Sequence, residues 1–262
     1  MSWRRLRAAG VLGLNERNAR LVAPLNPRDR FPAVDDKVRS KQLAIAAGIP
    51  VPALLGVVSA YGDVPGVHAK VGDGRPFVVK PVQGAQGNGV LVVTGRRDGA
   101  YVRSDGSLLG TQDLEYHLDG ILAGLHSLGG RPDRAMLEER LTVHPLLAPV
   151  AFEGVPDVRV IVYRGEPAMA MLRLPTQRSR GRANLHQGAV AAGIDLDSGR
   201  TTHGLFDGRA CLRHPDTGQL VVDLQLPDWP RILEIARRAA VAFGLGYLGI
   251  DVVIDATPGP VL

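Results

Sequence analysis

The most informative stretch of this sequence is Phe77-Val-Val-Lys80-Pro-Val-Gln-Gly84-Ala-Gln-Gly87-Asn-Gly89. Its β-branched residues predict a strand over 77–81 and a partner strand over 90–93, joined by a turn that holds three glycines. Lys80 supplies a cation at the strand end, and a glycine backbone approaches an anion without a Cβ clash. The stretch is therefore either a polyphosphate-binding hairpin or an ordinary glycine-rich hairpin with a solvated lysine. It is not a Walker A loop, which needs Gly-Lys-Ser/Thr at the start of a helix.

Strand and helix patterns alternate on both sides of this hairpin. A helix is predicted over 37–47, with Asp35 and Asp36 where an N-cap belongs and Gly48 ending it. Further helices are predicted over 63–71, over 111–128 with Thr111 as the cap, and over 229–243. The remaining strands are predicted over 54–58, 135–139, 157–163, 168–174 and 247–254. This pattern favours an α+β or mixed α/β fold, and no Gly-x-Gly-x-x-Gly follows the first strand, which disfavours a Rossmann fold.

Composition excludes several classes of function. The chain has 262 residues and a net charge of +5, but only 5% are aromatic and no basic tail is present, which argues against nucleic-acid binding. The single cysteine, Cys211, excludes a disulfide scaffold and indicates a reducing compartment. Nearly all basic residues are arginine, and the only lysines are Lys37, Lys41, Lys70 and Lys80, so a lysine within a motif is informative.

The N-terminus has a basic stretch followed by a short apolar one, without a small-residue cleavage site. We interpret it as an amphipathic surface helix ending near Arg20, followed by an extended linker with Pro24, Pro27 and Pro32, rather than as a signal peptide. No stretch is apolar enough over about 20 residues to predict a membrane span. We therefore expect a cytoplasmic protein.

Charged residues elsewhere have two interpretations each. Glu138 and Glu139 end a strand and could form a surface charge pair. Arg159 and Arg173 are expected on one face of a hairpin, where arginines suit phosphate or are simply solvated. The loop 178–188 carries three arginines and is either a binding loop or a disordered basic loop. Asp251 lies in an apolar strand, where a carboxylate needs a partner, a metal ion or an edge position.

In this order and spacing, these pieces resemble the ATP-grasp superfamily, most closely its ribosomal-protein S6 and α-L-glutamate ligase-like branch. The similar segments are Asp36-Lys37-Val-Arg-Ser-Lys-Gln-Leu43, the hairpin after Lys80, Asp157-Val-Arg159, and Arg182-Ala-Asn184-Leu-His186-Gln-Gly188. The resemblance implies two α+β subdomains that grip a nucleotide. The expected division is an N-terminal helix and linker over 1–34 and an ATP-grasp domain over 35–262, with the smaller lid subdomain over about 50–135 and the larger over about 136–262.

The resemblance also implies roles for individual residues. The phosphates of ATP would be bound by Lys37 and Lys80 beneath the hairpin residues Gly84, Gln86, Gly87 and Gly89. The Glu139 carbonyl and the Leu141 amide would read the adenine edge, Asp157 would bind the ribose hydroxyls, and Glu138 would also contact the nucleotide. The γ-phosphate and the acyl acceptor would be surrounded by the catalytic residues Arg159, Arg173, Arg182 and Asn184. The substrate would contact Arg182 and His186, and Asp251 would hold Mg²⁺, or Mn²⁺ in its place.

One departure concerns that metal. The branch places two more metal ligands in a Leu-Glu-x-Asn segment, where this sequence stops at Pro258-Gly-Pro-Val-Leu262. One protein carboxylate holds a hard cation weakly. We interpret this as a truncated chain, and the alternative is a non-catalytic ATP-binding module. A shortened core would also expose an apolar edge and favour self-association.

The function expected from the resemblance is an ATP-dependent carboxylate–amine ligase. It would form an amide or peptide bond through an acyl phosphate, from small-molecule or peptide carboxylate and amine substrates. Nucleic acid is not an expected partner.

Overall fold

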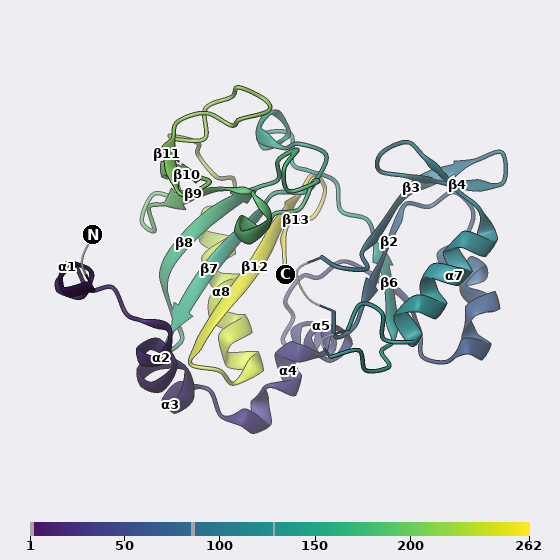
Figure 1. The fold of residues 1–262 in the computed structure, drawn as a ribbon, viewed down its shortest axis with the longest axis horizontal. Coiled ribbons are helices and arrows are strands. Elements are labelled where there is room, and N and C mark those ends of the chain that lie inside the picture. The colour runs from purple at the N-terminus through teal and green to yellow at the C-terminus, as the bar shows by residue number, and fades with distance from the viewer. Residues whose placement is uncertain (1–2, 85–86, 128) are drawn as a thin grey trace.

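The computed structural model describes residues 3–84, 87–127 and 129–262. Two antiparallel sheets form two halves that stand side by side, with the C-terminal residue between them (Figure 1). This arrangement confirms the predicted α+β class.

The smaller half is built on a six-stranded sheet with the order β1-β6-β2-β3-β4-β5. Its strands are β1 (Leu54–Val58), β2 (Phe77–Pro81), β3 (Leu91–Arg97), β4 (Ala100–Arg103), β5 (Leu108–Leu109) and β6 (Ala135–Glu139). Its helical segments are η3 (Tyr61–Gly66), α6 (Val67–Val71) and α7 (Thr111–Leu122). Phe77 of β2 and Leu114 of α7 are fully buried in the core of this half.

The larger half is built on a seven-stranded sheet with the order β11-β10-β9-β8-β7-β12-β13. Its strands are β7 (Asp157–Tyr163), β8 (Glu166–Leu174), β9 (Val190–Ile194), β10 (Thr201–Phe206), β11 (Arg209–Cys211), β12 (Tyr247–Asp255) and β13 (Gly259–Val261). The helix α8 (Trp229–Phe243) covers the face of β7, β8 and β12, and the short η4 (Ala148–Val150) precedes the sheet (Figure 1). Ile232 and Ala236 of α8 are fully buried in this core.

The N-terminal region differs from the prediction. It is a series of short helical segments: α1 (Trp3–Ala8), α2 (Leu14–Arg17), η1 (Asn18–Val22), α3 (Ala23–Leu25), η2 (Arg28–Arg30) and α4 (Pro32–Asp35). The predicted helix ending near Arg20 is therefore broken after α1, and the predicted extended linker is wrong. Pro24 and Pro32 lie in the first turns of α3 and α4, where a proline ring fits a helix and no amide donor is needed.

Two helix boundaries test the capping signals directly. The helix α5 (Lys37–Ala46) begins as predicted, because the Asp36 carboxylate accepts a hydrogen bond from the Arg39 amide at 2.9 Å. The predicted helix over 111–128 is too long, since α7 has Gly110 as its N-cap and ends at Leu122. Gly124 then takes φ +87°, and a Cβ there would overlap the Arg131 carbonyl oxygen, so the chain turns back early.

In the described ranges no helix has the length and apolar character needed to cross a bilayer.

Candidate functional site

A cavity of about 1140 Å³ lies between the two halves. Lys80 and Glu138 line it from the smaller half, while Asp157, Arg159 and Asp251 line it from the larger half. A second cavity, of about 660 Å³, adjoins the first and shares Lys80, Glu138 and Asp251 with it. Residues that are far apart in the sequence therefore meet at one place, as a ligand site between two subdomains requires.

One buried carboxylate organises the lysines at this place. Glu138 is 3% exposed and pairs with Lys80 through one oxygen and with Lys41, at 3.1 Å, through the other. Lys41 also donates to the Pro52 carbonyl. Burial by itself would raise the pKa of Glu138, but the two lysines outweigh burial and hold that pKa below its usual value. The surface-charge interpretation of Glu138 is therefore wrong.

Lys37 lies on the first turn of α5 and lines the second cavity. Its Nζ donates to the carbonyl oxygens of Val82 (3.2 Å) and Gly84 (2.5 Å), at the base of the glycine-rich hairpin. Burial lowers the pKa of Lys37, and the Asp133 carboxylate opposes that shift. Lys37 therefore joins α5 to the hairpin.

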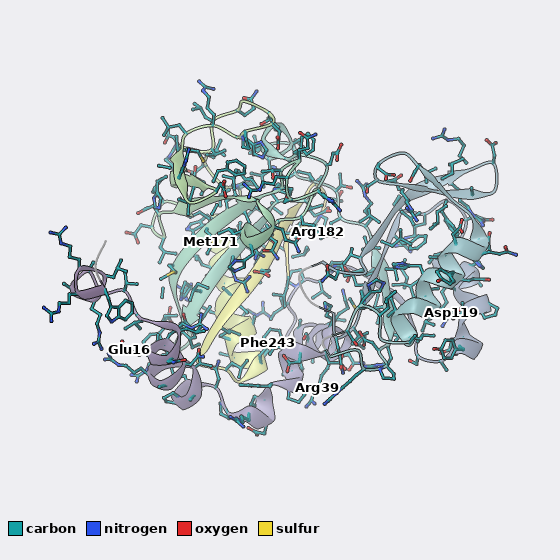
Figure 2. All side chains as sticks on the ribbon, viewed as in Figure 1. Glu16, Arg39, Asp119, Met171, Arg182 and Phe243 are labelled. Atoms are coloured by element: carbon teal, nitrogen blue, oxygen red, sulfur yellow. The ribbon has the colours of Figure 1, made fainter. Side chains whose placement is uncertain are left out.

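The hairpin glycines have different surroundings. Gly87 lines the larger cavity, and a Cβ there would lie 3.4 Å from the Arg182 side chain, so the hairpin tip meets the opposite half. Figure 2 shows Arg182 on the side of the larger half that faces the smaller half. Gly84 and Gly89 do not line either cavity. The Gly84 carbonyl accepts a hydrogen bond from Lys37, and Gly89 lies against the ring of His126. Gln86 lies outside the described residues.

An arginine–aspartate cluster forms the other wall. Arg173 binds Asp157 through two hydrogen bonds of 2.5 and 2.6 Å and reaches Asp251 at 2.9 Å, and Arg159 lies 3.5 Å from Asp251. The sheet register explains the cluster, because Asp157 is opposite Arg173 and Asp251 is opposite Arg159, all on one face. Burial raises the pKa of Asp157 to about 6, with Arg173 opposing the shift and Asp251 adding to it. The prediction that Arg159 and Arg173 share a face is confirmed.

The remaining predicted residues also line the larger cavity: Glu139, Leu141, Arg182, Asn184 and His186. Glu139 pairs with Arg75 at 3.0 Å, and Arg182 donates to Gln187 at 3.3 Å. Asn184 caps the short helix η5 (Leu185–Gln187) by accepting from the His186 amide at 3.0 Å. The loop 178–188 is thus ordered by its own capping bonds rather than disordered.

A comparison with known families agrees with this geometry. Residues 16–262 match the family described as sugar-transfer associated ATP-grasp. The chain belongs to that ATP-grasp family. The predicted resemblance to the ATP-grasp superfamily is confirmed, and the ATP-grasp fold binds ATP.

Relatives of this ATP-grasp chain include two proteins named probable alpha-L-glutamate ligase. The one from Enterobacter sp. (strain 638) is 39% identical over 240 residues, which cover 91% of this chain and 57% of the relative. The one from Azotobacter vinelandii (strain DJ / ATCC BAA-1303) is 26% identical over 175 residues, covering 67% of this chain and 47% of the relative. The chain thus spans about half the length of the curated relatives it matches.

Solved structures of similar shape include a RimK domain protein ATP-grasp from Sphaerobacter thermophilus DSM 20745. It is 18% identical, covers 99% of this chain and 67% of its own, and has a TM-score of 0.46. The ATP-grasp ligase PsnB complexed with minimal precursor is 20% identical, covers 99% of this chain and 62% of its own, and has a TM-score of 0.45.

The described residues of this ATP-grasp chain do not by themselves fit a magnesium ion. Mg²⁺ is bound by several oxygen ligands in octahedral geometry. Asp251, the predicted ligand, has Oδ2 on Arg173 and Oδ1 on Arg159, and no cluster of three metal-binding side chains occurs within the described ranges. Two cationic neighbours disfavour a divalent cation at that carboxylate. In this arrangement Asp251 is an ion-pair partner of the arginines.

Lys41 is a charged residue lining this ATP-grasp site to which the sequence analysis gave no role. It is 6% exposed and lines the second cavity beside Lys37 and Lys80. The sequence held two signals for it. Lysine is scarce in this chain, and Lys41 follows Lys37 by four residues, which places both on one side of a helix.

Proposed function

We propose that this chain carries the nucleotide-binding site of an ATP-dependent carboxylate–amine ligase. The observation that carries the proposal is the convergence of Lys37, Lys80 and the Arg159–Arg173 pair on adjoining cavities between the two halves. Cations on both walls suit a triphosphate and a transferring phosphoryl group, where catalysis depends on positioning and charge neutralisation.

The proposed roles follow the positions of the side chains. Lys80 lines the larger cavity, and its Nζ forms an ion pair with Glu138 and binds a phosphate oxygen of the nucleotide. Lys37 holds the hairpin base against α5, so that the hairpin covers the phosphates. The backbone of Glu139 and Leu141, at the junction of the two halves, reads the adenine edge. Asp157, whose two oxygens hold Arg173, positions that guanidinium rather than binding the ribose.

The proposed reaction has two steps. A substrate carboxylate oxygen attacks the γ-phosphorus of ATP, and the bond from that phosphorus to the β,γ-bridging oxygen breaks. The products of this step are an acyl phosphate and ADP. An amine then attacks the acyl carbon, phosphate leaves with the electron pair of the C–O bond, and the nitrogen loses a proton to give the amide. Arg159, Arg173 and Arg182 supply planar cationic donors for the phosphoryl oxygens, with Asn184 and His186 beside the acceptor. Closure of the hairpin against Arg182 would exclude water from the acyl phosphate.

Calorimetric titration with ATP tests the site. Lys80→Met removes the cation from the cavity wall and should weaken ATP binding by about tenfold or more, the contribution of one charge-assisted hydrogen bond. Lys70→Met is the matched control, because Lys70 is exposed and donates to the Val57 carbonyl in the smaller half. Equal ATP affinity of the two variants, both shown to be folded by circular dichroism, would contradict the proposal.

A second candidate is a non-catalytic ATP-binding module. It is favoured by the arginine partners of Asp251, which leave the described residues without a metal-holding carboxylate cluster. The two candidates differ in turnover. Release of ADP that depends on a carboxylate and an amine supports the ligase, whereas saturable ATP binding without ADP release across a broad set of amino acids and peptides supports the binding module.

A further inference from the structure

The N-terminal arm, residues 3–20, is a surface segment that the proposed function does not use. It consists of α1, α2 and the start of η1, and none of its residues is buried. Figure 1 shows α1 apart from the rest of the protein, on the side of the larger half that is remote from the smaller half. The body begins just after it, where Asn26 exchanges hydrogen bonds of 2.7 and 2.9 Å with Tyr247 of β12.

Four large apolar side chains of the arm are exposed. Trp3 is 51% exposed, Val11 45%, Leu12 38% and Leu14 67%. The Trp3 ring lies against Gly13, where an added Cβ would be 3.2 Å from it, so Trp3 and the residues around Gly13 belong to one surface. Exposed apolar residues that occur singly need no explanation, but a contiguous group marks an interaction surface.

The same arm is strongly basic. It carries five arginines and one acidic residue: Arg4, Arg5, Arg7, Arg17, Arg20 and Glu16. Glu16 is shared by Arg7 at 3.5 Å and Arg20 at 2.9 Å, which leaves a large positive excess. Figure 2 shows nitrogen-tipped side chains projecting from α1 in several directions. The arm thus combines tryptophan, aliphatic residues and arginines in two short helical turns and the link between them. Such a composition is typical of peptides that lie in the interface of an anionic bilayer.

We propose that the N-terminal arm docks this protein on membrane surfaces rich in anionic lipid. The arginines are attracted to the lipid headgroups within a Debye length of the surface, and Trp3 with the leucines inserts at the boundary of headgroups and acyl chains. The cavity between the halves stays open to solutes, because the arm lies on the far side of the larger half (Figure 1). This inference does not depend on the proposed ligase activity.

Tryptophan fluorescence and vesicle sedimentation of the full chain test the proposal. The chain has two tryptophans, and the second, Trp229, is 4% exposed with its indole N–H on the Leu196 carbonyl. A shift of emission to shorter wavelength on adding vesicles therefore reports Trp3, and Trp3→Phe should abolish the shift. Vesicles of phosphatidylcholine with about 30% phosphatidylglycerol should bind the protein, and phosphatidylcholine alone should not.

Charge-reversal variants distinguish the effect of the arginines in the arm from the effect of the net charge of the whole protein. Replacing Arg4, Arg5 and Arg7 by Glu should lower the partition onto anionic vesicles by about tenfold or more. A control triple variant with Arg97, Arg131 and Arg209 replaced by Glu carries the same net charge, and those arginines are exposed in other parts of the protein. Its partition should stay close to that of the wild type.

Apolar contact is tested separately. Leu12→Ser with Leu14→Ser should also weaken vesicle binding, because the insertion of aliphatic side chains is lost. Three outcomes would overturn the proposal: no binding of the wild type to anionic vesicles, an equal loss in the control triple variant, or arm-dependent binding to a short DNA duplex in the absence of vesicle binding.

Discussion

Replacing Lys41 by Met tests the buried charge network at its least exposed cation. Lys41 and Glu138 have side chains 6% and 4% exposed, with Nζ 3.1 Å from the carboxylate. Removing one partner of a buried ion pair costs about 3–5 kcal/mol, because the other charge is left uncompensated. Here Lys80 remains paired with the second oxygen of Glu138, so we expect a cost at or just below the lower end of that range, about 2–3 kcal/mol.

The pH dependence gives the prediction a sign. The lysines hold the pKa of Glu138 below its ordinary value, so Glu138 contributes stability above its unfolded-state pKa and loses that contribution as the pH falls through the folded-state pKa. In Lys41→Met, one of the two lysines that oppose the effect of burial is gone, so the folded-state pKa of Glu138 rises. The difference in the free energy of unfolding between wild type and Lys41→Met should therefore be largest near neutral pH. It should shrink as the pH falls, first through the raised folded-state pKa of Glu138 in the variant and then through the lowered pKa in the wild type.

Urea unfolding at neutral and acid pH measures both effects, with Lys70→Met as a control of equal chemistry on an exposed lysine. Lys41→Met combined with Glu138→Gln should lose less than the sum of the two single changes, because the two residues share one ion pair. Two results would contradict a stabilising ion pair between Lys41 and Glu138. One is that the losses in the free energy of unfolding add up in the double variant, and the other is that Lys41→Met is as stable as the control at neutral pH.

Three further substitutions have definite expected outcomes. Asp157→Asn leaves the Arg173 guanidinium, 11% exposed, with a weaker partner, and should lower the free energy of unfolding by about 2–3 kcal/mol in urea; an unchanged midpoint would contradict this. Gly89→Ala puts a side chain at φ +72° and a Cβ 2.5 Å from the ring of His126, so it should cost about 1–2 kcal/mol or more, measured by thermal unfolding. Ile232→Ala empties part of the core under α8 and should cost about 2–5 kcal/mol, and a loss under about 1 kcal/mol would mean that the site is less closely packed.

Local patterns along the chain predicted a large part of the secondary structure. The bounds of β1, β2 and β6 and the Asp36 cap agree with the prediction, because β-branched runs and capping side chains act within a few residues. β9 was not predicted, since Val190-Ala-Ala-Gly-Ile has few β-branched residues and pairs through its backbone with β8. α7 was predicted too long because the limit is a contact between Gly124 and Arg131, which no pattern along one helix contains.

For the candidate site, too, local patterns identified some residues, whereas their partners depended on the tertiary structure. Residue types and spacing identified Lys80, Arg159 and Arg173 as candidates, and the period of two along a hairpin placed the arginines on one face. The partners of these residues came from pairings between distant segments: β12 beside β7 brings Asp251 to the arginines, and α5 against the smaller sheet brings Lys41 to Glu138. Propensity and capping act over a few residues and can be read locally, whereas an ion pair between remote segments has no energy until the whole chain has packed.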